Sequence, residues 1–230
     1  MEQDILDLFR GEFGKVEIDE AGFTISYTEA GSSSSQGYII TRGIRENAPL
    51  PREVRKKINS YFDEVKGNLS KRFNKVELYI RKNEEPSIKY AWEDEQYKKD
   101  KLDSARVFPQ WVNERMMSFI YEQEFPNGPT ARDEDGDPLY ESTWDRGFFT
   151  FKITDGNVDC DVLLFKDEIP RSINLTLPEY FIKAMLEHHE LTNVGILKGD
   201  WKLWNKLVII SPHNDLPYVK MDEYVVYSLE

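Results

Sequence analysis

The sequence predicts an α+β protein in which antiparallel sheets, built from hairpins and a meander, carry helices packed on one face. Three observations support this fold class. Short segments rich in β-branched and aromatic residues occur in pairs that are separated by turn residues. Longer segments place apolar residues at steps of three and four. The paired segments follow one another directly, whereas a parallel α/β protein would alternate single strands with helices.

The chain begins with a predicted short helix followed by a three-stranded meander. Residues 1–10 are charged and typical of a helix, and residues 15–19 alternate as in a strand. Residues 22–28 and 37–42 are rich in β-branched and aromatic residues and are expected to be strands. The serine run in residues 31–37 separates them, and we expect it to form a flexible hairpin tip.

A long helix is predicted from Pro51 to Phe73, because apolar residues recur there at helical steps. Pro51 suits an early helical position, where its missing N–H is not needed. The opposite face is basic, and in an acidic chain we interpret it as a solvated or internally paired face rather than a nucleic-acid site. The apolar stripe consists of Leu50, Val54, Ile58, Tyr61, Phe62, Val65, Leu69 and Phe73. The basic face consists of Arg52, Arg55, Lys56, Lys57, Lys66, Lys71 and Arg72.

The remaining elements are expected as hairpins and helices in sequence, with no internal repeat evident. They are a hairpin of residues 76–80 and 88–92, a helix from Pro109 to Glu124, a hairpin of residues 147–153 and 158–165, a helix from Thr176, and closing strands at residues 207–210 and 224–229. Between two of these elements, residues 127–143 are rich in Gly, Pro and Asp. We therefore expect an N-terminal lobe of residues 1–125, an acidic connector of residues 126–145 and a C-terminal lobe of residues 146–230.

Length and composition limit the cellular setting. A chain of 230 residues can bury roughly 70% of its unfolded surface and needs no disulfide. The single cysteine, Cys160, cannot form an internal disulfide, which favours a reducing compartment. No apolar run approaches the roughly 20 residues of a membrane span, and the charged N-terminus is not typical of a signal peptide. These features predict a cytoplasmic protein with no membrane partner.

The charge distribution points to a protein partner. The chain has 42 acidic and 30 basic residues, a net charge of −12, which argues against a protein that binds nucleic acid through phosphates. More than half of this excess lies between Glu122 and Asp145, where Arg132 is the one basic residue. The acids there are Glu122, Glu124, Asp133, Glu134, Asp135, Asp137, Glu141 and Asp145. The segment is either a solvated loop or a negative docking surface for a basic protein.

The predicted partner-binding residues follow from the docking hypothesis: Asp133, Glu134, Asp135, Asp137, Glu141, Trp144 and Asp145. Aromatic side chains carry much of the binding energy in interfaces, so Trp144, Tyr140, Trp201 and Trp204 are candidates for the desolvated contacts. Packing in the core is the alternative for each of these four aromatic residues.

Metal-binding motifs fail on spacing. Asp133–Asp137 resembles the start of a calcium loop, but the glycine and glutamate that such a loop needs fall on Pro138 and Trp144. His188 and His189 are adjacent and would point about 100° apart on a helix, so they cannot share a zinc ion. We therefore predict no metal and no cofactor.

Nucleophilic motifs also fail. Ser211, His213 and Asp215 supply the residue types of a catalytic triad, but neighbours on one short segment diverge instead of converging. Cys160 lies between Asp159 and Asp161, whose charges disfavour a thiolate, and alternation turns it toward the core. The sequence predicts no enzyme. The alternatives are a metal-dependent hydrolase that uses the carboxylates of the acidic segment, and an oligomerising scaffold domain.

Residues 1–125 resemble the YezG-like immunity (antitoxin) proteins of bacterial polymorphic toxin systems. The similar features are the opening helix, the meander, the long helix that Pro51 begins, a hairpin ending in Tyr90-Ala-Trp-Glu-Asp94 and a following helix that contains tryptophan. The resemblance implies a cytoplasmic protein that binds and neutralises a toxin domain, often a basic nuclease, and supplies no catalytic residues. We therefore expect an acidic immunity-type protein whose partner is a basic toxin.

Overall fold

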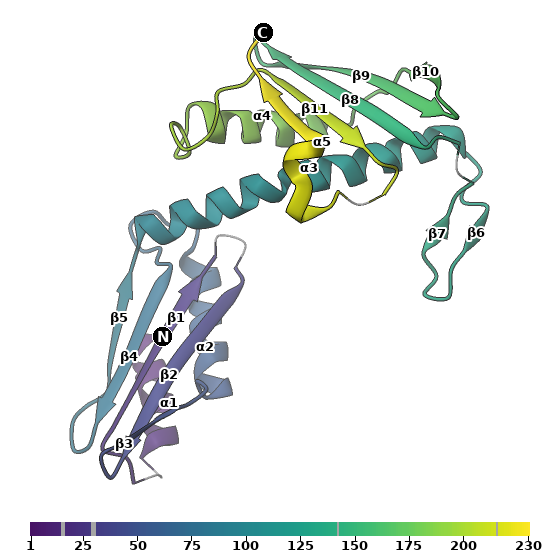
Figure 1. Cartoon of the computed structure of the whole chain (residues 1–230). Helices are drawn as coiled ribbons and strands as arrows, with labels where there is room; N and C mark the ends of the chain where they lie inside the picture. The colour runs from purple at the N-terminus through teal and green to yellow at the C-terminus, as the bar shows by residue number, and fades with distance from the viewer. Residues whose placement is uncertain (15–16, 29–30, 142, 215) are drawn as a thin grey trace. The chain divides into compact units, whose positions relative to one another are not determined.

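The computed structural model describes residues 1–14, 17–28, 31–141, 143–214 and 216–230, and it confirms the α+β class with antiparallel sheets (Figure 1). The contacts divide the chain into two compact units, unit 1 (Met1–Asp100) and unit 2 (Lys101–Glu230). Each unit has its own hydrophobic core. No helix in the described ranges is both long enough and apolar enough for a bilayer.

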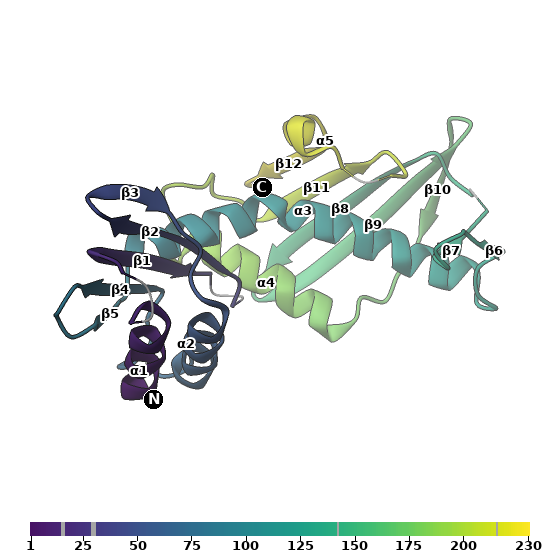
Figure 2. The same ribbon diagram turned by 90° about the horizontal axis from the view of Figure 1, so that it is seen from below.

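Unit 1 is a five-stranded antiparallel sheet with two helices on one face (Figure 2). The helices are α1 (Glu2–Phe13) and α2 (Arg52–Val65). The strands are β1 (Glu20–Tyr27), β2 (Ser33–Thr41), β3 (Ile44–Asn47), β4 (Lys75–Arg81) and β5 (Ser87–Ala91), in the order β3-β2-β1-β4-β5. The core lies between the sheet and the apolar stripes of both helices, as the alternating burial of β1 and β4 requires.

Unit 2 is also a five-stranded antiparallel sheet with two helices along one face (Figure 1). These helices are α3 (Asp94–Glu124), of which the part from Lys101 onward lies in unit 2, and α4 (Glu179–Asn193). The strands are β8 (Arg146–Thr154), β9 (Asn157–Lys166), β10 (Ile169–Ile173), β11 (Lys206–Ser211) and β12 (Val225–Ser228), in the order β10-β9-β8-β11-β12. A small hairpin of β6 (Ala131–Arg132) and β7 (Pro138–Leu139) precedes β8, and a 3₁₀ turn η1 (Tyr218–Lys220) and α5 (Met221–Tyr224) precede β12.

The two units repeat one topology, which corrects the expectation that the chain has no internal repeat. Each unit runs helix, three strands, helix, two strands, and each sheet places its fourth strand beside its first. In unit 2 the hairpin β6–β7 and the segment η1–α5 are additions to this common plan. In both units a leucine and a proline precede the second helix, as Leu50-Pro51 and Leu177-Pro178.

The same side-chain clamp closes both sheets. In unit 1 the Asn74 amide donates to the Glu93 carbonyl at 2.8 Å and accepts from the Glu93 N–H at 2.6 Å. In unit 2 Asn205 makes both bonds to Glu230, at 3.0 and 2.8 Å. Such a pair satisfies a main-chain donor and acceptor where the last strand ends. The repeat therefore extends from topology to specific contacts.

The lysine after each asparagine completes the correspondence. Lys75 forms an ion pair with Glu93, and Lys206 forms one with Glu230. Lys75 lies opposite Ala91 in the β4–β5 pairing, and Lys206 lies opposite Ser228 in the β11–β12 pairing. This register fixes the residue-by-residue match of the last two strands in the two units.

Several predicted elements differ in extent. Most of the serine run is not a hairpin tip: Ser33 to Ser35 belong to β2 and lie opposite Tyr27 to Ile25 of β1, and Gly31 and Ser32 alone stay in the turn. Serine supplies the backbone N–H and C=O groups that the ladder needs, so low hydrophobicity does not prevent strand pairing. Residues 15 and 16 of the strand predicted at 15–19 lie outside the described residues, and residues 17–19 are not in a strand. The strands β3, β6, β7 and β10 were not predicted, because they are short and mostly exposed.

Both long helices also differ from their predicted ranges. α2 ends at Val65 rather than Phe73, because the Asn68 side chain accepts the Ser70 N–H and closes a turn instead. Helix α3 starts at Asp94, well before Pro109, and contains that proline as a buried residue.

The division between the units also lies earlier than the expected connector at 126–145. Residues on α3 such as Val112, Met116 and Ile120 pack in the core of unit 2, so this helix belongs with the sheet that follows it.

The basic face of α2 is largely paired within unit 1. Lys56, Lys57 and Lys66 form ion pairs with Glu53, Asp4 and Asp63. Arg55 donates to the Ser35 hydroxyl. These contacts agree with the interpretation of this face as internally paired.

Candidate functional site

The segments that unit 2 adds to the common plan are the first place to look for function, since insertions in repeated units form loops that are often on the binding face. Residues 14–19 join the first helix to the first strand in unit 1, whereas residues 125–145 do so in unit 2. Residues 82–86 join the last two strands in unit 1, whereas residues 212–224 do so in unit 2. The first insertion carries the acidic hairpin, and the second forms a wall of a pocket.

Hairpin β6–β7 is organised by one of its own acids. The Asp133 carboxylate accepts the backbone N–H groups of Asp135 at 3.0 Å and Asp137 at 2.8 Å. The Asp133 N–H donates to the Asp137 carbonyl at 3.0 Å, and Gly136 adopts φ +88°, where a side chain would be strained. The Arg132 guanidinium donates to the Gly136 carbonyl at 2.6 Å. The turn is thus held together by Asp133 and Arg132.

The other carboxylates of the insertion face solvent. Glu134, Asp135, Asp137 and Glu141 are exposed. Across the described ranges, none of these four forms an ion pair with a lysine or arginine of the chain. The structure therefore brings Glu134, Asp135 and Asp137 together on one turn that extends from unit 2 (Figure 1).

Two of the predicted partner-binding residues serve the fold instead. Trp144 is fully buried in the core of unit 2, where it packs against Phe149, so its side chain cannot contact a partner. Asp145 is occupied by the Lys166 ammonium at 2.9 Å and the Asp167 N–H at 2.9 Å. The Asp167 N–H, followed by Lys166, lowers the pKa of this carboxyl.

Another acid of the segment is also paired: Glu124 forms an ion pair with Arg171. Among the described acids of the segment, the turn, Glu141 and Glu122 on α3 are exposed and have no ion pair. The surface that the docking hypothesis can use is thus smaller than the sequence suggested.

The other candidate aromatic residues are either buried in the core or half-buried at the surface. Trp204 is fully buried and donates its indole N–H to Thr192 at 2.9 Å. Tyr140 is half-buried and stacks on Tyr121 with ring centroids 4.6 Å apart. Trp201 is half-buried and lines a pocket. Packing therefore accounts for Trp204, whereas Trp201 remains available to a ligand or partner.

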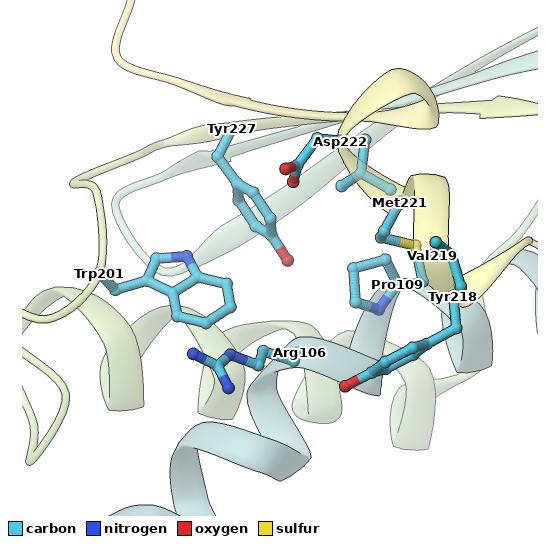
Figure 3. Close-up of a pocket in the computed structure, with 9 residues that line it drawn as sticks. Arg106, Pro109, Trp201, Tyr218, Val219, Met221, Asp222 and Tyr227 are labelled. Carbon is cyan, nitrogen blue, oxygen red and sulfur yellow. The ribbon is translucent and has the colours of Figure 1, made fainter.

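The pocket that Trp201 lines has a volume of about 340 Å³ and lies between α3, the segment η1–α5 and β12 (Figure 3). The Trp201 and Tyr227 rings form one side of it, and Tyr218 and Met221 lie on the opposite side (Figure 3). Arg106 and Pro109 of α3 form its floor (Figure 3). Tyr218 is 61% exposed and Val219 is 94% exposed, so the rim presents apolar surface to solvent. Tryptophan, tyrosine and arginine are the residue types that dominate protein interfaces.

Among the described residues that were considered for catalysis, Ser211 and His213 are not hydrogen-bonded to each other. The His213 ring bonds to the Tyr121 hydroxyl at 2.6 Å, and the buried Ser211 hydroxyl has no hydrogen-bond partner among the described residues. Asp215, the third member of the sequence triad, lies outside the described residues. The Cys160 thiol packs against the core of unit 2, where burial, and then Asp161, raise its pKa to about 12.

One of the two histidines considered for a metal has a structural role. His188 is buried, stacks on Phe108 with centroids 4.1 Å apart and bonds to the Tyr227 hydroxyl at 3.0 Å. Within the described ranges, no three or more histidine, cysteine, aspartate and glutamate side chains gather as metal ligands would.

No protein-family model matches the chain, and no curated protein is similar to it. The resemblance to YezG-like immunity proteins stays a prediction, and the functional argument depends on the geometry above.

Proposed function

We propose that this protein is an immunity-type binding protein that neutralises a basic protein toxin with nuclease activity. The acidic turn of hairpin β6–β7 is the electrostatic anchor that meets the cationic surface of the toxin. The observation that carries the proposal is the turn itself, where Glu134, Asp135 and Asp137 are exposed and have no ion pair within the described chain.

The physical basis is the effect of clustered charge on association. Screening limits each exposed charge to a range of about 8 Å at physiological salt, so separate surface acids act independently. Glu134, Asp135 and Asp137 fall within four consecutive positions of one turn, so their potentials add. A surface of this kind raises association rates by roughly 10- to 1,000-fold for a partner of opposite charge. The acidic turn would also pair with the lysine and arginine side chains that a nuclease uses to bind phosphate.

Asp133 has a different role in the proposal. Its carboxylate holds the turn through two backbone N–H groups, so it keeps the other three acids in place. A charge variant should therefore leave Asp133 intact, because otherwise a change of conformation would be mixed with a change of charge.

The test uses the full chain to capture proteins secreted by the cells that produce it and by competing cells. The association rate of a captured protein is then measured at 50 mM and 500 mM salt. The hairpin variant carries Glu134→Gln, Asp135→Asn and Asp137→Asn. The matched control carries Asp159→Asn, Asp161→Asn and Glu179→Gln, which removes the same charge from exposed positions elsewhere on unit 2.

We expect a basic partner that the wild type and the control capture and inhibit. The hairpin variant should associate with it about tenfold more slowly at low salt, with the difference vanishing at high salt. An association rate and salt dependence that are the same in all three proteins would refute the anchor. A captured partner whose activity is not inhibited would refute the immunity function.

A further inference from the structure

The last strand of unit 2 has an unprotected edge. Strand β12 ends its sheet, and among the described strands its one neighbour is β11. Proteins usually protect such edges with charged residues, prolines or bulges, because an open edge pairs with other chains. The segment Val225–Ser228 contains none of the charged residues or prolines that would protect it.

The repeat supplies an internal comparison. Strand β5 occupies the same place in unit 1, and there Lys89 lies opposite Glu77. The register of unit 2 puts Val226 at the position of Lys89, opposite Val208. The same site therefore has a charged pair in unit 1 and an apolar pair in unit 2, and Val226 is 47% exposed. At this position unit 1 has a charged residue that protects the edge, and unit 2 has an exposed valine.

The pocket described above adjoins this edge. Val225 and Tyr227 line it, and these residues alternate along β12 with Val226 on the opposite face of the sheet. A strand added beside β12 would alternate in the same way. One of its side chains would enter the pocket beside Trp201 and Met221, and the next would lie beside Val226.

The charge at the pocket selects a basic segment. Two charged side chains line it, Arg106 and Asp222. Arg106 forms an ion pair with Asp103 at 3.6 Å, whereas Asp222 is exposed and has no ion pair in the described part of the chain. The unpaired charge is thus negative, and a lysine or arginine beside an apolar residue complements it.

We propose that β12 binds an extended segment of a protein partner as an added strand, with an apolar side chain in the pocket and a basic side chain beside Asp222. Main-chain bonds to the edge supply affinity, and the pocket and Asp222 supply specificity. This inference deepens the proposed function, because it names a second contact for a basic partner and the chemistry of the segment that makes it.

The probe is the capped peptide Lys-Val-Phe-Val-Lys carrying a fluorophore, and the measurement is its fluorescence anisotropy with the full chain. A peptide with glutamates in place of lysines tests the charge, and one with methylated backbone nitrogens tests strand addition. Val226→Lys places in unit 2 the residue type that unit 1 has at this site. Val194→Lys, at a valine that is 59% exposed elsewhere on unit 2, is the matched control.

We expect saturable binding of the lysine peptide that Val226→Lys weakens at least tenfold and that Val194→Lys leaves unchanged. The glutamate and methylated peptides should bind at least tenfold more weakly, and Asp222→Asn should remove the preference for lysine. Absence of saturable binding, or equal binding by Val226→Lys, overturns the proposal. Analytical ultracentrifugation gives a further test. A wild type that forms dimers while Val226→Lys is monomeric also overturns the proposal, because a second copy of the chain then occupies the edge.

The test is independent of the acidic turn. The hairpin variant Glu134→Gln, Asp135→Asn, Asp137→Asn keeps β12 intact and should bind the peptide as the wild type does. A failure of the electrostatic anchor would appear in the association experiment alone, and a failure of strand addition would appear in the peptide experiment alone.

Discussion

Buried His188 should make the stability of unit 2 depend on pH. The ring is 4% exposed and stacks on Phe108. Burial, with a smaller contribution from His189, lowers its pKa to about 3. In the unfolded chain a histidine titrates near pH 6.5. Because the folded protein disfavours the proton that the unfolded chain accepts, stability is full above about pH 6.5 and falls as the pH decreases toward 3.

The size of the effect follows from these two pKa values. At pH 4.5 the unfolded histidine is almost fully protonated and the folded one is almost fully neutral, which costs about 2.7 kcal/mol relative to pH 8. His188→Gln keeps a group that can bond to the Tyr227 hydroxyl and does not titrate. The variant loses the stack on Phe108, at a cost of about 1 kcal/mol. It should therefore be less stable than the wild type at pH 8 and about 1.7 kcal/mol more stable at pH 4.5, with the two stability curves crossing at about pH 6.

The assay is urea unfolding at several pH values, followed by tryptophan fluorescence. Of the five tryptophans, Trp92 lies in unit 1 and the rest lie in unit 2. A Trp92→Phe background for both proteins therefore makes the signal specific to unit 2. Parallel stability curves, in which the difference between wild type and His188→Gln does not change with pH, would show that the buried ring is not the titrating group.

Two further predictions concern the repeat and the cysteine. Asn205→Ala should destabilise unit 2 and Asn74→Ala should destabilise unit 1, each by about 1–3 kcal/mol, because each substitution leaves a main-chain donor and acceptor without a partner. Urea unfolding measures both effects, and a variant whose own unit keeps its stability would contradict the prediction. Cys160, whose pKa is raised to about 12, should not react with a disulfide reagent at pH 8 until the protein is unfolded, and rapid labelling of the native protein would contradict its burial.

Much of the fold follows from local sequence patterns. The hairpins β4–β5 and β8–β9 were predicted because alternation and turn residues are encoded within a few positions. The start of α2 was predicted from its apolar stripe and from Pro51. The first part of α3 has no such stripe, because residues 94–104 are mainly polar and only Ala105 begins the buried face. Sequence periodicity cannot detect a helix that has little to bury.

The repeat was missed because it is encoded in a few scattered positions. The Asn-Lys pairs at 74–75 and 205–206, with the glutamates Glu93 and Glu230, are the clearest signal. Insertions of different length separate these positions in unit 2, so a fixed period does not exist. Comparing the segments around each Leu-Pro and each Asn-Lys would have found the correspondence.

The candidate site was predicted only in part. Clustering of the acids around residues 133–137 is a local property and was visible in the sequence. The burial of Trp144 and the pairing of Asp145 depend on Phe149 and Lys166, whose positions only the folded sheet defines. The pocket beside β12 depends on residues as far apart as Arg106 and Tyr227, so no sequence pattern indicates it.

The position of the acidic hairpin makes it a separable module. In unit 1, residues 14–19 join the first helix to the first strand, whereas unit 2 uses residues 125–145 for the same connection. The fold therefore does not need the longer connection. A chain shortened at the tip of β6–β7 would retain Trp144 and the five-stranded sheet. Conversely, connections of other length and sequence could replace residues 125–145, so that one scaffold could present loops of different surface chemistry by changing only this connection.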